Sequence, residues 1–588
     1  MLIRKKILFW FGVFTALAGL VVFASLLAEP SKNGGFLGFS TGRWAALFFN
    51  LLLLAGVFFF IYKLQMDHAR KLEVLFSNER NLFNLFFLCI ILFGASFPSA
   101  LGKIPIVRSS EYFGRISPSL FWLSFASGVF GLILLAALRQ SVLRWCRQFI
   151  PFNEFVPQNL NLTPIQYVSM RAIALLYIIY QWASHLQVHT AKSLPDSIDY
   201  LFPASFAWNN PVLWTHTKPW GTAVLYKLTG NSPITIDVVQ TILSALAWLM
   251  LAWTFSTVMR SARLRIATFA FILCFSLAPS VQMWNHILQS ESLSISLMVF
   301  ILAVWISLLR RWHSGKLVAL ILLFVWWIGT RDTNIYLSLL IAAILFLAGS
   351  IFRSHRYYWA VSVLLVLLSL VNMQIAEMPT LPRWLYPLTN TVLYRILPNE
   401  EFLKYFESNE MPVSTELLAL SGGLAYSDNF AVFNSPALND VEKWLFKYGK
   451  QVYVRFLLDH PFYTLLSPWQ SIDDLLGTDK LTGYAPEHYN PILGWWFGSL
   501  YPSSLGLMGL LSLIVIASSL WTKPWHEQQR TFLLMTGFLT LFFPHFYLVW
   551  HGDADEVARH AIQASLQLRL SLWLLLFLSL DSFRKISK

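Results

Sequence analysis

Charged residues are scarce in this chain. Only 12% of its 588 residues are Asp, Glu, Lys or Arg, whereas 56% are hydrophobic and the mean hydropathy is +0.57. A soluble protein of this length carries about twice that share of charge, because its surface must be hydrated. The shortage of charge therefore excludes a soluble globular protein and indicates that a lipid bilayer is the solvent.

Cysteine is also scarce, and internal repeats and low-complexity tracts are not found. Cys89, Cys146 and Cys274 lie in or beside apolar runs, so neither a disulfide framework nor a cysteine-based zinc site is expected. The formal net charge of +13 is distributed over short loops between apolar runs. This distribution is typical of membrane orientation and of contact with anionic lipid headgroups, and it argues against nucleic-acid binding.

Long apolar runs are what the chain contains instead. A membrane-spanning helix needs about 20 mostly apolar residues, and about fourteen such runs can be marked. We therefore expect an all-α polytopic membrane protein with about fourteen transmembrane helices. The runs centre near Phe14, Leu53, Cys89, Val129, Leu176, Leu246, Phe271, Val299, Leu322, Leu345, Leu365, Ile514, Phe538 and Leu574.

The first apolar run, Ile7–Leu27, follows three basic residues, as the core of a signal peptide does. It is longer than a typical signal-peptide core, and Ala28-Glu29-Pro30 is a poor cleavage site, so we expect a retained helix. With the N-terminus inside, the inner loops collect 23 Lys and Arg residues, against about ten on the short outer loops. The sequence thus predicts an integral membrane protein with both termini in the cytoplasm.

Two polar interruptions separate the apolar runs, and the alternation of spans places both outside. The longer one, Ala376–Asn490, holds 14 acidic and 8 basic residues, a net charge of −6, while the rest of the chain carries +19. Within it, Asn439–Leu458 has apolar residues at helical spacing opposite lysines, which predicts an amphipathic helix. We expect four regions: an accessory membrane module of about four helices at 1–164, a membrane core at 165–375 with an outer loop at 187–235, an extracytoplasmic domain of mixed or mainly helical structure at 376–490, and C-terminal membrane helices at 491–588.

Ionisable residues gather on this predicted outer side. An ionisable side chain at membrane depth is costly unless it is paired or hydrated, so each is a functional candidate. Carboxylates mixed with cations suit a site that activates a hydroxyl and holds a phosphate. The candidates are Asp196, Asp199, His216, Lys218, His286, Glu291, Arg331 and Asp332, and later His551, Asp553, Asp555, Glu556, Arg559, His560 and Arg569.

Each candidate also has a structural interpretation. Asp196 is the best general base, but Pro195-Asp196-Ser197 is equally a helix-start signal in which Asp caps free amides. Glu291 and Arg331 are either site residues or an ion pair between adjacent helices, and His286 is alternatively a satisfied polar residue. Glu556 and His560 lie four residues apart and can meet on one helix face. No spacing matches an established metal site, so no metal is expected.

Five of these segments together resemble the GT-C superfamily of membrane glycosyltransferases that use polyprenyl-phosphate sugars, which includes protein mannosyltransferases and aminoarabinose transferases. The resemblance extends over about Leu160–Leu580, outside the four leading helices. It rests on the order and spacing of Asp196-Ser197-Ile198-Asp199-Tyr200, His216-Thr217-Lys218-Pro219-Trp220-Gly221, Gln289-Ser290-Glu291-Ser292-Leu293, Gly329-Thr330-Arg331 and Glu556-Val557-Ala558-Arg559-His560.

The resemblance implies a GT-C-like core and transfer of a sugar from a polyprenyl-phosphate donor to a glycan, lipid or protein acceptor outside the cytoplasm, without a cofactor. Asp196, Asp199 and Glu291 would then be catalytic, with Asp196 as the base of an inverting displacement. His216, Lys218, His286, Arg331, Glu556, Arg559 and His560 would bind substrate. Two alternatives stay open: a ligase or polymerase of lipid-linked glycans, and a polytopic transporter or lipid flippase.

Overall fold

The computed structural model describes residues 163–351, 357–379, 381–502 and 528–583, with a few isolated positions between 16 and 58. Contacts divide the chain into two compact units, Met1–Pro151 with Arg455–Ser467 and Phe152–Val454 with Pro468–Lys588. The second unit contains every candidate residue predicted above. The accessory module expected at 1–164 lies almost wholly outside the described residues.

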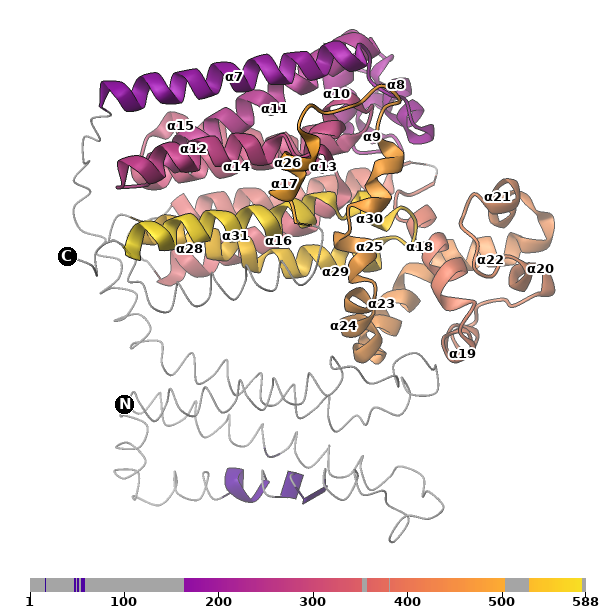
Figure 1. Ribbon diagram of the computed structural model, residues 1–588. Coiled ribbons are helices and arrows are strands. Elements are labelled where there is room, and N and C mark those ends of the chain that lie inside the picture. Colours follow the sequence, from indigo (N-terminus) through magenta and orange to yellow (C-terminus); the bar gives the residue numbers. More distant parts are fainter. Residues whose placement is uncertain are drawn as a thin grey trace. The chain divides into compact units, whose positions relative to one another are not determined.

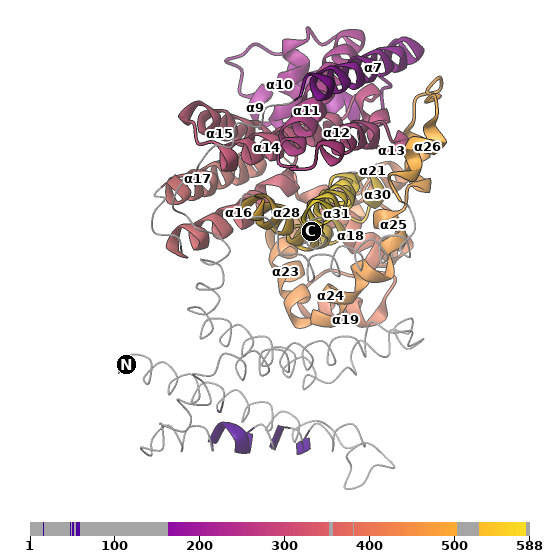
Figure 2. The same ribbon diagram turned by 60° about the vertical axis from the view of Figure 1, so that its left-hand side comes forward.

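Helices make up the regular structure of the described residues, apart from one isolated bridge between Lys192 and Ile287. This confirms the expected all-α class. The long helices of the second unit run side by side (Figures 1 and 2). They are α7 (Pro164–Val188), α11 (Pro233–Ser256), α12 (Ala262–Ser276), α14 (Ser290–Arg310), α15 (Ser314–Ile328), α16 (Asp332–Ile351), α17 (Tyr357–Glu377), α28 (Gln529–Thr540), α29 (Phe542–Gly552) and α31 (Ile562–Phe583).

Five helices in the described residues are long and apolar enough to cross a membrane: Pro233–Ser256, Ser290–Arg310, Tyr358–Glu377, Gln529–Gly552 and Ile562–Asp581. A sixth span results if Ala262–Ser276 and Pro279–His286, bent by 63°, are counted as one. The expected count of about fourteen is therefore not met. Five of the expected centres, near Phe14, Leu53, Cys89, Val129 and Ile514, lie outside the described residues. The α15 helix falls short because it has only 15 residues, about 22 Å at 1.5 Å per residue.

Helix α14 lies at the centre of the packing. It contacts α11, α15, α28 and α31, and 78% of its apolar window is buried within the protein. Small serines at Ser290, Ser292, Ser294 and Ser296 are all buried, and side chains of this size let neighbouring helices approach closely. The central position of α14 brings it into contact with helices that lie far apart in the sequence, such as α11 and α31.

The bend between α12 and the segment after it follows from Pro279. Proline lacks an amide hydrogen and clashes with the preceding turn, so α12 ends at Ser276. The short helices α13 (Pro279–Gln282) and η4 (Met283–His286) then turn the chain, and Gln289 is extended before α14 begins. This turn carries His286 and Glu291 to the same end of the helices.

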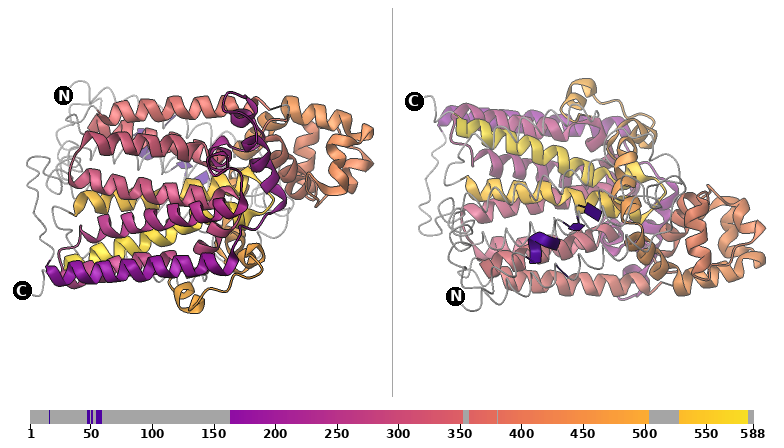
Figure 3. Two further views of the ribbon diagram at one scale, coloured as in Figure 1. Left: turned by 90° about the horizontal axis from the view of Figure 1, so that it is seen from above. Right: turned by 90° about the horizontal axis from the view of Figure 1, so that it is seen from below.

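Short helices occupy that end of the second unit (Figure 3). In the segment 187–235 these are η3 (Pro195–Ser197), α8 (Ile198–Ala204), α9 (Val212–Thr215) and α10 (Trp220–Leu228). The later part of the chain contains α18 (Leu385–Thr391), η5 (Val392–Ile396), α19 (Glu400–Ser408), α20 (Thr415–Ala419), α21 (Ser427–Asn434), η6 (Pro436–Leu438), α22 (Asn439–Trp444), η7 (Leu445–Gly449), α23 (Lys450–Asp459), α24 (Pro461–Gln470), α25 (Ile472–Leu476), η8 (Asp479–Tyr484), α26 (Gly494–Ser499) and α30 (Val557–His560). Of these, α23 and α24 include residues 455–467, which belong to the first unit.

The amphipathic helix predicted at Asn439–Leu458 is confirmed as the continuous run α22, η7 and α23. Val441 and Leu445 are buried, while Lys443 and Lys447 are exposed, as the spacing predicted. A π-helical turn at Leu445–Gly449 interrupts the regular hydrogen bonding. Neither Asn439 nor Asp440 caps the helix, because Leu438 occupies the N-cap position and no side chain makes a capping hydrogen bond there.

Two glycines join the segment 187–235 to the turn between α15 and α16. Gly221 N donates to the Gly329 carbonyl at 2.6 Å. A Cβ on Gly221 would lie 2.7 Å from that oxygen, and one on Gly329 would lie 2.4 Å from the Trp220 ring. Only glycine permits this approach at both positions, and it brings the segment after Lys218 next to the turn that carries Arg331.

Candidate functional site

Asp196 is positioned by backbone contacts around it. Its loop is tied to the segment before α14, because Lys192 N donates to the His286 carbonyl at 2.8 Å and Leu288 N donates to the Lys192 carbonyl at 2.9 Å. The Ser197 hydroxyl accepts from Leu194 N and donates to the Leu288 carbonyl. These bonds fix the loop beside the start of α14.

The Asp196 carboxylate is held by two cations from distant parts of the chain. Its Oδ2 accepts from Lys218 Nζ at 3.1 Å and from Arg559 Nη2 at 3.0 Å. Burial alone would raise the pKa of Asp196, but the charges of Lys218 and Arg559 outweigh it and lower that pKa. The side chain thus carries a negative charge near neutral pH and does not serve as the helix cap that the sequence also allowed.

Glu291 and Arg331 form a second, deeper pair. Arg331 Nη2 lies 3.7 Å from Glu291 Oε1, and these side chains are 7% and 1% exposed. The same Nη2 donates to His560 Nδ1 at 3.0 Å. Burial and the neighbouring Arg559 and Arg331 lower the pKa of His560, so its ring is neutral and Nδ1 is free to accept this bond.

These buried groups have unused hydrogen-bonding capacity. Arg331 Nη1, Arg559 Nε and Glu291 Oε2 are buried, and among the described residues none of the three has a hydrogen-bond partner. A buried charged donor without a partner costs free energy, about 1–3 kcal/mol or more. Such a group in a native protein calls for an explanation, and a ligand that supplies the missing acceptor is one.

Arg559 is the residue on which most carboxylates converge. It contacts Asp196 and also Glu556, which lies three residues earlier. Glu291, Glu556 and Asp196 together raise the pKa of Arg559 against the effect of burial. Glu556 adopts a left-handed backbone conformation (φ 43°), which is strained for a residue with a side chain, and it accepts a hydrogen bond from the Tyr484 hydroxyl at 2.7 Å.

His216 and Asp199 lie beside this cluster. Burial lowers the pKa of His216, whereas burial raises the pKa of Asp199. The His216 carbonyl accepts from Arg383 Nε at 3.0 Å, and Arg383 Nη1 lies 3.2 Å from Asp332 Oδ1. Arg383 thereby joins the segment 187–235, the start of α16 and the segment before α18.

The structure brings nine of the ten predicted site residues into this neighbourhood, which we call the charge cluster: Asp196, Asp199, His216, Lys218, Glu291, Arg331, Glu556, Arg559 and His560. It also includes Asp553, a candidate to which no role was assigned, and three residues that were not candidates. Asp553 accepts from Asn390 Nδ2 at 2.8 Å and lies 3.9 Å from His560 Nε2. Arg383, Tyr484 and Asn390 had no distinguishing sequence signal, because they lie in the long polar segment.

His286 belongs to a different group, which we call the histidine cluster. Its Nδ1 contacts Asp237 Oδ1 at 2.7 Å, and its Nε2 lies 3.1 Å from the Ser184 hydroxyl. His185 contacts the other oxygen of Asp237. Asp237 is fully buried four residues into α11, so a carboxylate inside an apolar run was a signal that the sequence offered and that was missed.

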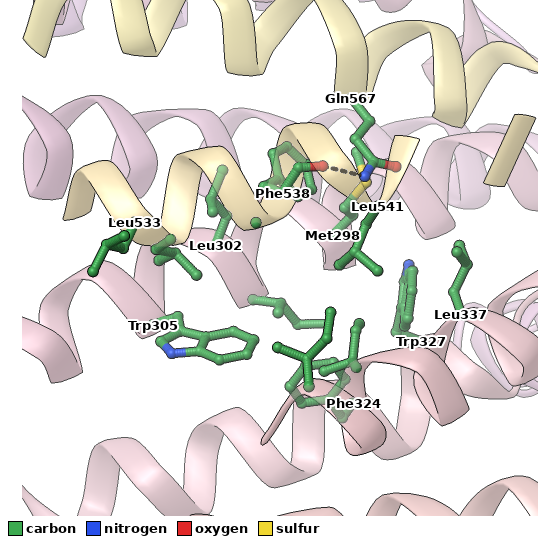
Figure 4. A pocket seen from close by; sticks show the side chains of 15 residues that line it. Met298, Leu302, Trp305, Phe324, Trp327, Leu337, Leu533, Phe538, Leu541 and Gln567 are labelled. Atoms are coloured by element: carbon green, nitrogen blue, oxygen red, sulfur yellow. Dashed lines mark hydrogen bonds between the residues drawn. The ribbon is translucent and has the colours of Figure 1, made fainter. Parts of the chain in front are cut away.

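An apolar cavity of about 150 Å³ lies between α14, α15, α16, α28 and α31 (Figure 4). Trp305, Phe324 and Trp327 form one side of its lining, and Leu533 and Phe538 line it from α28. At one edge, Gln567 Nε2 donates to the Phe538 carbonyl at 2.6 Å. Trp327 is only four residues before Arg331, so the cavity approaches the charge cluster along α15.

In the described part of the chain, no group of three or more His, Cys, Asp or Glu side chains is arranged to hold a metal ion. Comparison of the chain with known protein families, with curated proteins and with solved structures gave no match.

Proposed function

We propose that this protein is a membrane glycosyltransferase that moves a sugar from a polyprenyl-phosphate donor to an acceptor on the extracytoplasmic side. The observation that carries the proposal is the set of buried cations with unpartnered donors, Arg331 Nη1 and Arg559 Nε, next to the ionised Asp196. A buried guanidinium with a free N–H suits a phosphate, which accepts several charge-assisted hydrogen bonds.

The proposed reaction is a direct displacement at the anomeric carbon. The acceptor hydroxyl oxygen forms the new bond to that carbon while the bond from the carbon to the phosphate oxygen breaks. The electron pair leaves on the lipid phosphate, whose charge Lys218, Arg331 and Arg559 stabilise. The hydroxyl proton passes to Asp196, whose Oδ1 is not engaged by either cation.

The remaining residues support this assignment. Glu291 Oε2 has no partner in the described chain and is suited to accept a hydrogen bond from a sugar hydroxyl. The cavity along α14 and α15 is lined by apolar and aromatic side chains, as an isoprenoid tail requires. A GT-C-like core in a bacterial inner membrane, with both termini in the cytoplasm, belongs to the same proposal.

The test is turnover of defined donors. Purified protein in lipid nanodiscs is incubated with a panel of polyprenyl-phosphate monosaccharides, and release of polyprenyl phosphate is measured. Asp196→Asn should reduce turnover about 10²–10⁴-fold, which is the usual contribution of a general base. The matched control is Asp440→Asn, which removes a carboxylate that is 82% exposed on α22. A folded Asp196→Asn variant with wild-type turnover would show that the base is wrong.

A ligase that uses whole lipid-linked oligosaccharides would leave the monosaccharide donors unused and consume lipid-linked oligosaccharides instead. A proton-coupled transporter is favoured by one observation, the buried carboxylate of Asp237 between two imidazoles, since such groups form proton relays in transporters. Proton uptake into proteoliposomes without product formation would establish the transporter and overturn the transferase.

A further inference from the structure

Aromatic side chains from the polar segment flank the charge cluster. Tyr386 on α18 makes edge-to-face contacts with Phe430 at 6.0 Å and with Phe433 at 5.1 Å between ring centroids. Phe430 and Tyr426 are 41% and 52% exposed. We call Tyr386, Tyr426, Phe430 and Phe433 the aromatic wall; α18 and α21, which carry three of the four, are labelled in Figure 1.

The aromatic wall is attached to the acidic segment of the site. Asn390 on α18 accepts a hydrogen bond from Ala425 N at 2.7 Å and donates to Asp553 Oδ1 at 2.8 Å. One amide therefore connects the loop before Tyr426 with the segment before Arg559. The rings are held at a defined position relative to the carboxylates and are not on an independent loop.

The carboxylates of Asp199 and Asp555 lie on segments next to the wall. The hydrogen bonds of Asn390 to Ala425 and Asp553 place the segment that carries Asp555 beside Tyr426. Arg383, three residues before Tyr386, is bonded to the His216 carbonyl, and the His216 ring lies 5.6 Å from that of Phe202, three residues after Asp199. Burial raises the pKa of Tyr386 and of Tyr426, and the charges of Asp199 and Asp555, respectively, raise them further. Within the described residues, neither Asp199 nor Asp555 forms an ion pair. They differ in this respect from Asp196 and Glu291, which face cations.

The chemistry of this surface is that of carbohydrate recognition. The C–H face of a sugar ring is apolar and packs on the face of an aromatic ring, whose π-electrons attract the positively polarised hydrogens. Carboxylates accept hydrogen bonds from the sugar hydroxyls. Asp199, Asp553, Asp555 and Glu556 repel an anionic ligand, since like charges placed opposite each other are costly.

We propose that the aromatic wall, with Asp199 and Asp555, binds the acceptor as a neutral glycan. This proposal rests on the proposed function, because only a transferase has an acceptor. The binding of the glycan itself can be measured without a donor. The buried Arg383 Nη2, which has no hydrogen-bond partner among the described residues, lies on the side chain bonded to the His216 carbonyl and provides one further donor for a hydroxyl. The donor phosphate is thus recognised by cationic side chains and the acceptor glycan by aromatic rings and carboxylates.

The experiment measures glycan binding without donor. Protein in nanodiscs is mixed with neutral tetrasaccharides of glucose, galactose or mannose, with their phosphorylated counterparts, or with a serine- and threonine-rich peptide. Saturation-transfer NMR then reports which ligand is bound. A neutral tetrasaccharide should bind, and Tyr386→Leu and Phe430→Leu should each weaken it about tenfold, because each removes one stacking face.

The matched control is Tyr394→Leu, which removes a tyrosine that is 52% exposed and outside the wall. Tyr386→Phe retains the ring and should retain most binding, which separates loss of stacking from a folding defect. Preference for the phosphorylated glycan, preference for the peptide, or equal binding by Tyr386→Leu and wild type would each overturn the proposal. Donor turnover is assayed separately, so glycan binding without turnover contradicts only the proposed function, and turnover without glycan binding contradicts only this inference.

Discussion

The charge cluster and the histidine cluster are both buried sets of ionisable groups, yet they differ in how completely they are satisfied. In the histidine cluster, both oxygens of Asp237 are bonded to imidazoles and the carboxylate is fully buried. In the charge cluster, Arg331, Arg559 and Glu291 retain unpartnered atoms, and Asp196 is 35% exposed. An ionisable residue in an apolar protein is thus not a sign of function by itself. Unsatisfied hydrogen-bonding groups beside a partly exposed carboxylate are the better sign of a functional site.

The largest effect expected from this comparison is on stability. Asp237→Ala leaves two buried imidazoles without their carboxylate, and breaking a buried pair in this way costs about 3–5 kcal/mol. The free energy of unfolding in mixed micelles should fall by that amount, while the turnover of the protein that stays folded should change little. If turnover per folded molecule is lost as well, the histidine cluster is part of the functional site.

Arg559→Gln, unlike Asp237→Ala, should act mainly on turnover. It removes a cation that neutralises Asp196 and Glu556 and is proposed to stabilise the leaving phosphate. Loss of such a preorganised donor reduces turnover about 10²–10³-fold. Arg559→Lys keeps the charge but not the planar guanidinium, so its turnover should lie between those of the wild type and the Gln variant. Turnover within twofold of wild type in the folded Gln variant would make the charge cluster a structural one.

A smaller effect is expected in the apolar cavity. Gly537 lines it, and a Cβ at this position meets no atom within 4 Å, so Gly537→Leu should fill part of the space without strain. Affinity for a long polyprenyl phosphate should fall a few-fold, while affinity for a short-chain analogue should not change. Thr536→Leu, at an exposed position one residue earlier, is the control. An equal loss for both chain lengths would exclude the cavity as a tail site.

The smallest effect concerns pH. Burial, with the charges of Asp553 and Glu556, raises the pKa of Asp555 to about 6 from 3.8. A carboxyl with a raised folded-state pKa binds its proton more tightly when folded, so its contribution to stability is lost as the pH rises from about 4 to about 6. The melting temperature of Asp555→Asn should therefore depend less on pH in this window than that of wild type. Identical pH profiles would contradict the assignment of the raised pKa to Asp555.

Much of the fold was accessible from local patterns. The apolar runs predicted an all-α membrane protein, and nine of the fourteen run centres lie in helices of the described residues. The helical spacing of the apolar residues in Asn439–Leu458 predicted its helix, because this spacing is a local property of the sequence. The number of spans was not predictable in the same way. Helix α7 is long enough to span a membrane but not apolar enough, and α15 is apolar but has only 15 residues.

Residue type and position along the chain were enough to select nearly every member of the charge cluster, because an ionisable group beside an apolar run is rare and costly. Only the tertiary structure decided which of them meet. Asp196 and Arg559 are 363 residues apart, and nothing local to either predicts the other as its partner. The same holds for His286, which resembled a site residue in sequence but is bonded to Asp237. Ion pairing depends on distances of a few ångströms in space, and helix packing sets these distances.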